Sequence, residues 1–209
     1  MRSDSVEKEI FLLGMMHLGQ PEYYADARRI LDSLRNEGYV VFFEGVGKWP
    51  PDMDSISRDT IQRKFRKVAR AHITHYQDGD NQSMTQYRNK KYVPQTLGIL
   101  GLYRDSAWCV HADLNYPEMI ARYEEDRGEI PLNSYDWNTP LLEKYKWRKG
   151  WGEENYSRYY LLRNVRDEFI VDSMMRSAYP KIVGVYGFGH LDGMEQRLAE
   201  KYGLTPVEK

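Results

Sequence analysis

The chain has 209 residues, a length that suits one compact domain or one domain with a large insertion. It carries 30 Lys and Arg against 31 Asp and Glu, a formal net charge of −1. This balance gives no electrostatic argument for nucleic acid or an anionic membrane surface as the main partner. The single cysteine, Cys109, excludes an intramolecular disulfide and a cysteine-based zinc site. No apolar run reaches membrane-spanning length and the polar N-terminus does not resemble a secretory signal, so we expect a cytoplasmic protein.

Apolar residues make up 41% of the chain, and their spacing predicts strands that alternate with helices. In chain order, the first half is predicted to contain a strand at 9–16, a helix at 22–35, a strand at 39–43, a loop at 45–54, a helix at 56–76 and a loop at 78–91. The second half is predicted to contain helices at 94–102, 116–125, 156–178 and 194–202, with strands at 108–113 and 181–186. Pro21 suits the first turn of its helix, and Gly203 suits the end of the last one.

This alternation predicts an α/β fold, with a mainly parallel sheet of about four or more strands flanked by helices and a helical insertion in the middle. We expect a single domain over residues 1–209. Within it, residues 48–106 are expected to form a helical and loop insertion, and residues 128–160 an aromatic segment that is either a lid over a substrate or a packed cover over the sheet. Ligands of such sheets bind outside the carboxyl ends of the strands.

Four polar residues stand at the ends of predicted strands: His17, Glu44, Asp113 and His190. Two imidazoles and two carboxylates at one sheet edge suit a divalent metal ion, or without a metal they supply a general base and an acid. Each residue also has a structural interpretation, since a strand-end histidine is often a satisfied structural group. Asp113 in particular is also placed to cap the helix predicted from residue 116.

The strand-end residues occur in motifs with a shared order along the chain. These are Gly14-Met15-Met16-His17, Glu44, Arg163-Asn164 on a long helix, and Gly187-Phe188-Gly189-His190. The set resembles the TraB/TIKI family, which belongs to a superfamily with erythromycin esterases and ChaN-like proteins. The resemblance covers mainly residues 9–46 and 158–203.

The resemblance implies an α/β domain with a divalent-metal-dependent hydrolase or peptidase site, in which manganese or cobalt supports activity. It implies that His17, Glu44 and His190 form the metal or catalytic set and that Arg163 and Asn164 line the site. Histidine and carboxylate ligands also suit zinc and iron. Members of the superfamily cleave peptides, hydrolyse esters, bind haem-related iron or inhibit plasmid pheromones, so the resemblance does not select one substrate.

We therefore expect a metal-assisted hydrolase that acts on a peptide or a small ester or amide. Glu44 or Asp113 is the expected general base, and Arg163 either steadies the negative intermediate or pairs with Asp167 one helical turn away. The alternatives are a metal-free esterase-like hydrolase, with His17 as base and His190 as acid, and a non-catalytic protein that sequesters a peptide or a metal complex.

Six Lys and Arg lie between residues 58 and 70 of the helix predicted at 56–76. A solvated helix face is the simplest interpretation of this cluster, and an anionic ligand or nucleic acid is its functional alternative. Because the net charge of the whole chain is close to zero, we expect neither a nucleic acid nor a membrane as partner.

Overall fold

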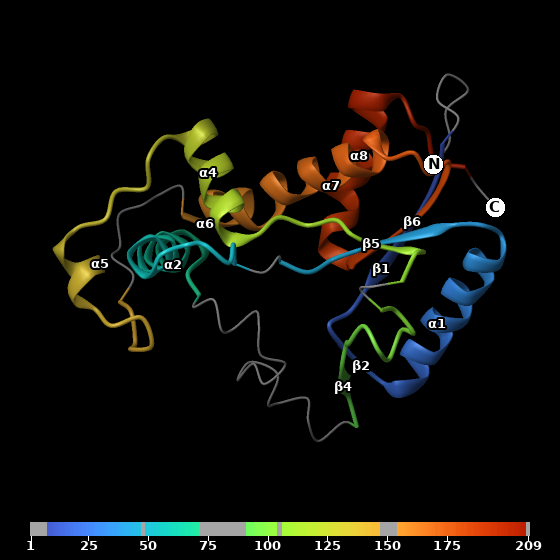
Figure 1. Cartoon of the computed structure of the whole chain (residues 1–209), viewed down its shortest axis with the longest axis horizontal. Helices are drawn as coiled ribbons and strands as arrows, with labels where there is room; N and C mark the ends of the chain where they lie inside the picture. The colour runs from blue at the N-terminus through green and yellow to red at the C-terminus, as the bar shows by residue number, and fades with distance from the viewer. Residues whose placement is uncertain (1–7, 47–48, 72–90, 104–105, 147–153, 208–209) are drawn as a thin grey trace. The chain divides into compact units, whose positions relative to one another are not determined.

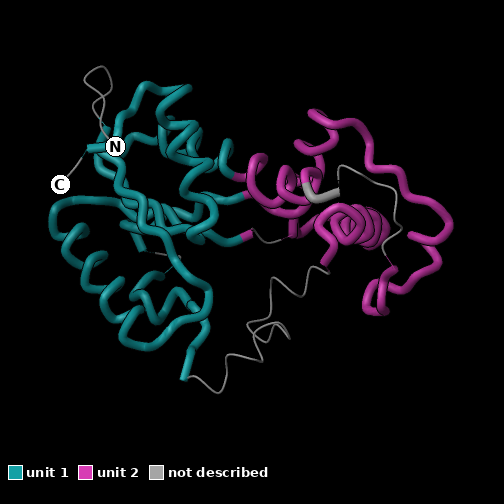
Figure 2. The backbone as a smooth tube through the Cα atoms, turned by 180° about the vertical axis from the view of Figure 1, so that it is seen from behind, with its two compact units in different colours: residues 1–45, 83–113, 167–209 teal, residues 46–82, 114–166 magenta. Residues whose placement is uncertain are grey.

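The computed structural model describes residues 8–46, 49–71, 91–103, 106–146 and 154–207. The chain forms two compact units, coloured separately in Figure 2. Unit 1 comprises residues 1–45, 83–113 and 167–209, and unit 2 comprises residues 46–82 and 114–166. The chain thus leaves unit 1 and returns to it twice. In the part of the chain that the structure describes, no helix is long and apolar enough to cross a membrane.

Unit 1 is built on a four-stranded sheet whose hydrogen-bonded strand pairs are all parallel (Figure 1). Its strands, in spatial order, are β1 (Glu9–Met15), β6 (Lys181–Gly187), β3 (Val40–Phe43) and β5 (Cys109–His111). This arrangement confirms the predicted α/β fold with a mainly parallel sheet. Because the strands run the same way, all their carboxyl ends lie at one edge, where Met15 pairs with Gly187 and Phe43 with His111.

Helices cover both faces of this sheet (Figure 1). Helix α1 (Pro21–Asn36) packs on the face that includes Val41 and Phe43, while α7 (Val165–Arg176) and α8 (Leu191–Tyr202) pack on the face that includes Phe42. Neighbouring residues of β3 therefore point into different cores. This explains why the sequence of β3 is continuously apolar rather than alternating.

The strand order places β6 between β1 and β3. The chain passes from β1 through α1 to β3, and it returns from β5 through α7 to β6. Crossovers between parallel strands are right-handed, so connections that travel in opposite directions put their helices on opposite faces. Because β6 lies between β1 and β3, the residues that follow β6 lie between the carboxyl ends of those two strands.

The helix predicted at 94–102 is wrong. A two-stranded antiparallel sheet forms there between β2 (Leu18–Gly19) and β4 (Val93–Pro94), and turns follow it. Gly101 adopts a φ of +69°, a left-handed conformation that ends regular helix. Leu100 and Leu102, two of the apolar residues in this segment, are instead buried in the core beneath α1.

Unit 2 is helical in the part that the structure describes. Its elements are α2 (Ser55–Ala69), α4 (Tyr116–Arg127), α5 (Ser134–Asn138), α6 (Glu154–Tyr159) and a π-helical turn, η2 (Tyr160–Asn164), that runs into α7. The predicted helix at 156–178 therefore forms with one irregular turn. Residues 72–76 of the helix predicted at 56–76, and residues 78–90 of the predicted loop, lie outside the described residues.

Candidate functional site

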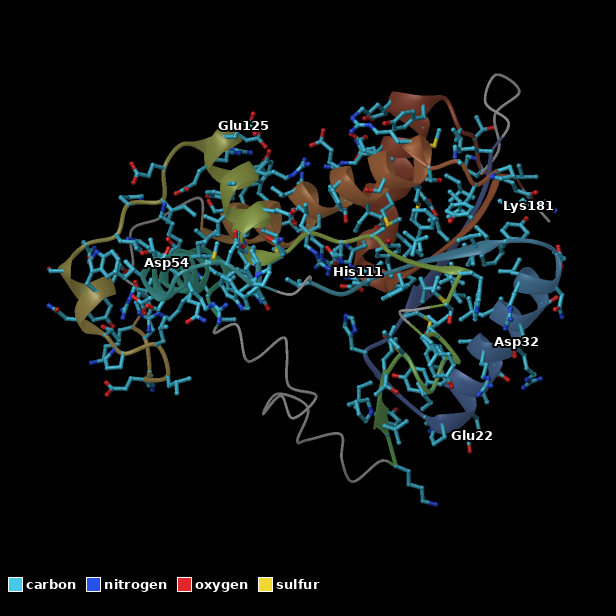
Figure 3. The ribbon with its side chains drawn as sticks, viewed as in Figure 1. Glu22, Asp32, Asp54, His111, Glu125 and Lys181 are labelled. Atoms are coloured by element: carbon cyan, nitrogen blue, oxygen red, sulfur yellow. The ribbon has the colours of Figure 1, made fainter. Side chains whose placement is uncertain are left out.

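The carboxyl edge of the main sheet gathers polar residues from all four strands of unit 1. In spatial order, His17 follows β1, His190 follows β6, Glu44 follows β3, and Asp113 follows β5. Figure 3 shows His111, the last residue of β5, at this end of the sheet, and Lys181, the first residue of β6, at the other end. The strand order therefore places His190 between His17 and Glu44.

His190 is a buried imidazole held between two carboxylates. It ends a short 3₁₀ turn, η3 (Phe188–His190), and is 3% exposed. Its Nδ1 lies 2.5 Å from Oδ1 of Asp167, a buried residue of α7. Its Nε2 lies 3.4 Å from Oε1 of Glu44. A carboxylate can only accept, so Nδ1 donates to Asp167 and the second nitrogen, Nε2, faces Glu44.

Glu44 is fixed on both its backbone and its side chain. Its N–H donates to the carbonyl of Val185 at 3.0 Å, which continues the β3–β6 ladder by one residue. Its Oε2 accepts the N–H of Gly187 at 2.5 Å. A hydrogen bond to an ionised carboxylate is stronger than one between neutral groups, so this contact orients the Glu44 side chain toward β6.

The surroundings of Gly187 show that His17 lies close to Glu44. A Cβ atom on Gly187 would lie 3.0 Å from Glu44 Oε2 and 3.0 Å from His17 Nε2. The distance between Glu44 Oε2 and His17 Nε2 is therefore at most the sum of these two distances. His17 is exposed whereas His190 is buried, so the two imidazoles lie at different depths.

Asp113 lies beside this group but contacts the backbone of the loop after β3. Its Oδ2 accepts the N–H of Gly45 at 3.0 Å. The alternative that Asp113 caps the following helix is wrong, because Asn115 caps α4 in a capping box with Glu118. The capping box satisfies the first backbone N–H groups of α4 and leaves Asp113 to the sheet edge.

Arg163 and Asn164 both lie in η2, in unit 2. Their roles at the site stay predictions. Asp167, which helical spacing offered as a partner of Arg163, contacts His190.

Two of the three predicted metal ligands have a spacing that suits one ion. Two ligand atoms bound at about 2.1 Å to a tetrahedral ion lie about 3.4 Å apart. Glu44 Oε1 and His190 Nε2 have this separation. In many metal sites a carboxylate accepts a hydrogen bond from the metal-bound histidine, and the contact between His190 and Asp167 is of this kind. In the described residues, however, no three or more His, Cys, Asp or Glu side chains are arranged to hold a metal ion. His17 therefore stays a predicted third ligand.

Sequence reasoning did not find the role of Asp167 or the close packing that supports it. A Cβ on Gly193, in the first turn of α8, would collide with the Asp167 carboxylate. This glycine lets α8 approach α7 closely enough for the pair with His190 to form. In the sequence, Asp167 stands out only as a carboxylate on a largely apolar helix face, and this pattern does not identify the residue that it contacts.

The basic cluster on α2 has protein partners in unit 2. Arg66 is 2% exposed and donates to the carbonyl of Pro140, and Lys67 pairs with the buried Asp136 at 2.7 Å. Lys64 pairs with Glu124 of α4, also at 2.7 Å. These cations thus join the helices of unit 2 to one another.

No protein-family model matches this chain, and neither the curated proteins nor the solved structures include a significant match to it.

Proposed function

We propose that this protein is a hydrolase that cleaves an ester or amide bond at the carboxyl edge of the main sheet in unit 1. The observation that carries the proposal is the contact series from Asp167 through His190 to Glu44. His190 and Asp167 are buried and Glu44 is partly buried, and placing such groups together is unfavourable unless they are paired; groups held in this way are frequent in active sites.

In this proposal Asp167 and His190 act as an oriented acid–base pair. Asp167 holds the Nδ1 proton, so Nε2 is the atom that exchanges protons with the substrate and an attacking water. The 3.4 Å between Nε2 and Glu44 Oε1 exceeds a normal hydrogen-bond length, which suits a water that contacts both atoms. His190 takes a proton from this water and later gives one to the leaving group. Asp167 stabilises the imidazolium between these steps.

His17 also receives a role beside this pair. The exposed His17, which with Glu44 lies close to Gly187, is proposed to donate to the substrate carbonyl oxygen.

In the metal-dependent form of the proposal, Glu44, His17 and Nε2 of His190 would instead hold a divalent ion, so Nε2 would not exchange protons in that form. Manganese or cobalt is favoured by the resemblance, with zinc and iron as other candidates. Such an ion would polarise the substrate carbonyl. The separation of Glu44 and His190 supports this form, and Asp167 would hold the metal-bearing imidazole in place.

A metal-free hydrolase is the second candidate. It is supported by the Asp167–His190 pair, which is already formed. In this form His190 and Asp167 act as the acid–base pair described above, and Glu44 positions the attacking water.

The test is hydrolysis of nitrophenyl esters and of a fluorogenic peptide mixture by chelator-treated protein, before and after addition of manganese, cobalt or zinc. The variants are His190→Ala and Glu44→Gln, with Glu37→Gln as the matched control, since Glu37 is exposed and precedes β3 at its opposite end. Turnover that both site variants lose and the control retains supports the proposal. Dependence of that turnover on added metal selects the metal-dependent form.

Two results would contradict the proposed function. One is turnover that persists unchanged in His190→Ala, since the activity would then arise elsewhere or from a contaminant. The other is saturable binding of a peptide or metal complex at this site, without hydrolysis of any substrate in the panel. This second result would favour the sequestering protein.

A further inference from the structure

The loop that follows β3 is held at one glycine by two side chains from the end of β5. The N–H of Gly45 donates to Asp113 Oδ2 at 3.0 Å. The carbonyl of the same residue accepts a hydrogen bond from His111 Nε2. His111 and Asp113 are two residues apart at the end of a strand, so their side chains leave the backbone on the same face.

The position of Gly45 matters because it is bonded directly to Glu44. The Gly45 N–H belongs to the peptide plane that starts at the Glu44 carbonyl, so fixing this N–H fixes the direction in which Glu44 leaves the strand. On its other side, Glu44 is fixed by its own N–H, which donates to Val185. Both peptide planes that flank Glu44 are therefore anchored, one by β6 and the other by the end of β5.

Both anchoring side chains are themselves held in place. The His111 ring packs against Phe43, with ring centroids 5.5 Å apart. Phe43 is the register partner of His111 across the β3–β5 ladder and belongs to the core beneath α1. Asp113 is 6% exposed, and a carboxylate buried to this extent needs a defined hydrogen-bonding role.

We propose that His111 and Asp113 are positioning residues, which act through Gly45 to hold the Glu44 carboxylate against Gly187 and His190. This inference rests on the proposed function for its catalytic consequence, but its structural part can be tested separately. It gives Asp113 a role as hydrogen-bond acceptor, in place of the predicted role as general base. It also gives a role to His111, which the sequence motifs did not include.

The experiment compares Asp113→Asn with Asp113→Ala in the full chain. Asparagine keeps an oxygen that can accept the Gly45 N–H but lacks the negative charge, whereas alanine lacks both. His111→Phe is the third variant, since it keeps a ring against Phe43 and removes only the donor to Gly45. Thermal melting verifies that each variant is folded.

The structural readout is the backbone amide proton of Gly187 in a ¹H–¹⁵N spectrum. Its hydrogen bond to Glu44 Oε2 shifts this resonance downfield, and Glu44→Ala defines the position without the bond. We expect Asp113→Ala and His111→Phe to move the resonance toward the Glu44→Ala position, and Asp113→Asn to leave it close to wild type. The kinetic readout is a fall in kcat of about 10- to 100-fold for the first two variants, with most activity retained by Asp113→Asn.

Two outcomes would overturn the inference. If Asp113→Asn is as inactive as Asp113→Ala while Gly187 keeps its resonance, the charge of Asp113 takes part in the chemistry. If Asp113→Ala and His111→Phe both leave the Gly187 resonance in place, the contacts with Gly45 do not determine where Glu44 lies. Failure of the proposed function is distinct, because the wild type would then hydrolyse no substrate while Gly187 still responded to these variants.

Discussion

Substitution of Gly187 by alanine probes the candidate site with a single added methyl group. The backbone of Gly187 has a φ of −51°, which any residue can adopt, so the change introduces no backbone strain. The new Cβ would lie 3.0 Å from both Glu44 Oε2 and His17 Nε2. Both are ends of side chains rather than backbone atoms, so they are displaced by a few tenths of an ångström while the fold is kept.

The size of the effect follows from this displacement. A misplacement of about 1 Å of reacting groups costs about 100-fold in rate, so a shift of about half that size predicts a fall of about 10-fold in kcat/KM. The hydrogen bond from the Gly187 N–H to Glu44 is strained by the same movement. The melting temperature should change little, because His17 is exposed and can swing away.

The assay measures kcat/KM and the melting temperature of Gly187→Ala beside those of Gly184→Ala. Gly184 lies on the same strand, but its Cβ would lie 2.7 Å from Met174 Cε and 3.2 Å from Leu12 Cδ2 in the core. Overpacking there should cost about 1–3 kcal/mol of stability and lower the melting temperature by about 3 °C per kcal/mol, with kcat/KM retained. Unchanged kcat/KM in a folded Gly187→Ala protein would refute the placement of the site.

Three further predictions concern single residues. Asp167→Asn should lower kcat/KM by about 10- to 100-fold, because His190 loses the carboxylate that orients it; full activity in this variant would contradict that role. Burial of Asp136 raises its pKa, but hydrogen bonds from a backbone N–H and from Lys67 outweigh this effect and lower the pKa. The stability that Asp136 contributes is therefore complete above the unfolded pKa of about 3.9 and is lost as the pH falls through the folded pKa, so Asp136→Asn should flatten the acid side of a plot of melting temperature against pH. Asn115→Ala should cost about 1 kcal/mol, measured by urea unfolding, because it removes the capping box of α4.

Local sequence patterns were sufficient for most of the elements of unit 1. Continuous apolar runs identified β1, β3 and β6, because a parallel strand covered on both faces must be apolar on both sides. Pro21 occupies the first turn of α1, and Gly203 ends α8 with a φ of +65°. The prediction failed at residues 94–102, where apolar residues at helical spacing belong to turns packed beneath α1.

By itself the sequence determined that polar groups follow each main strand, and therefore that His17, Glu44 and His190 stand at one edge of a parallel sheet. It did not determine their order across the sheet or their partners. Those depend on β6 lying between β1 and β3, and on α7 packing close enough for Asp167 to reach His190. Strand order and helix packing are set by contacts between residues far apart in the chain, which local spacing does not encode. For the same reason the sequence did not indicate the contact of Asp113 with Gly45, which joins residues 68 positions apart.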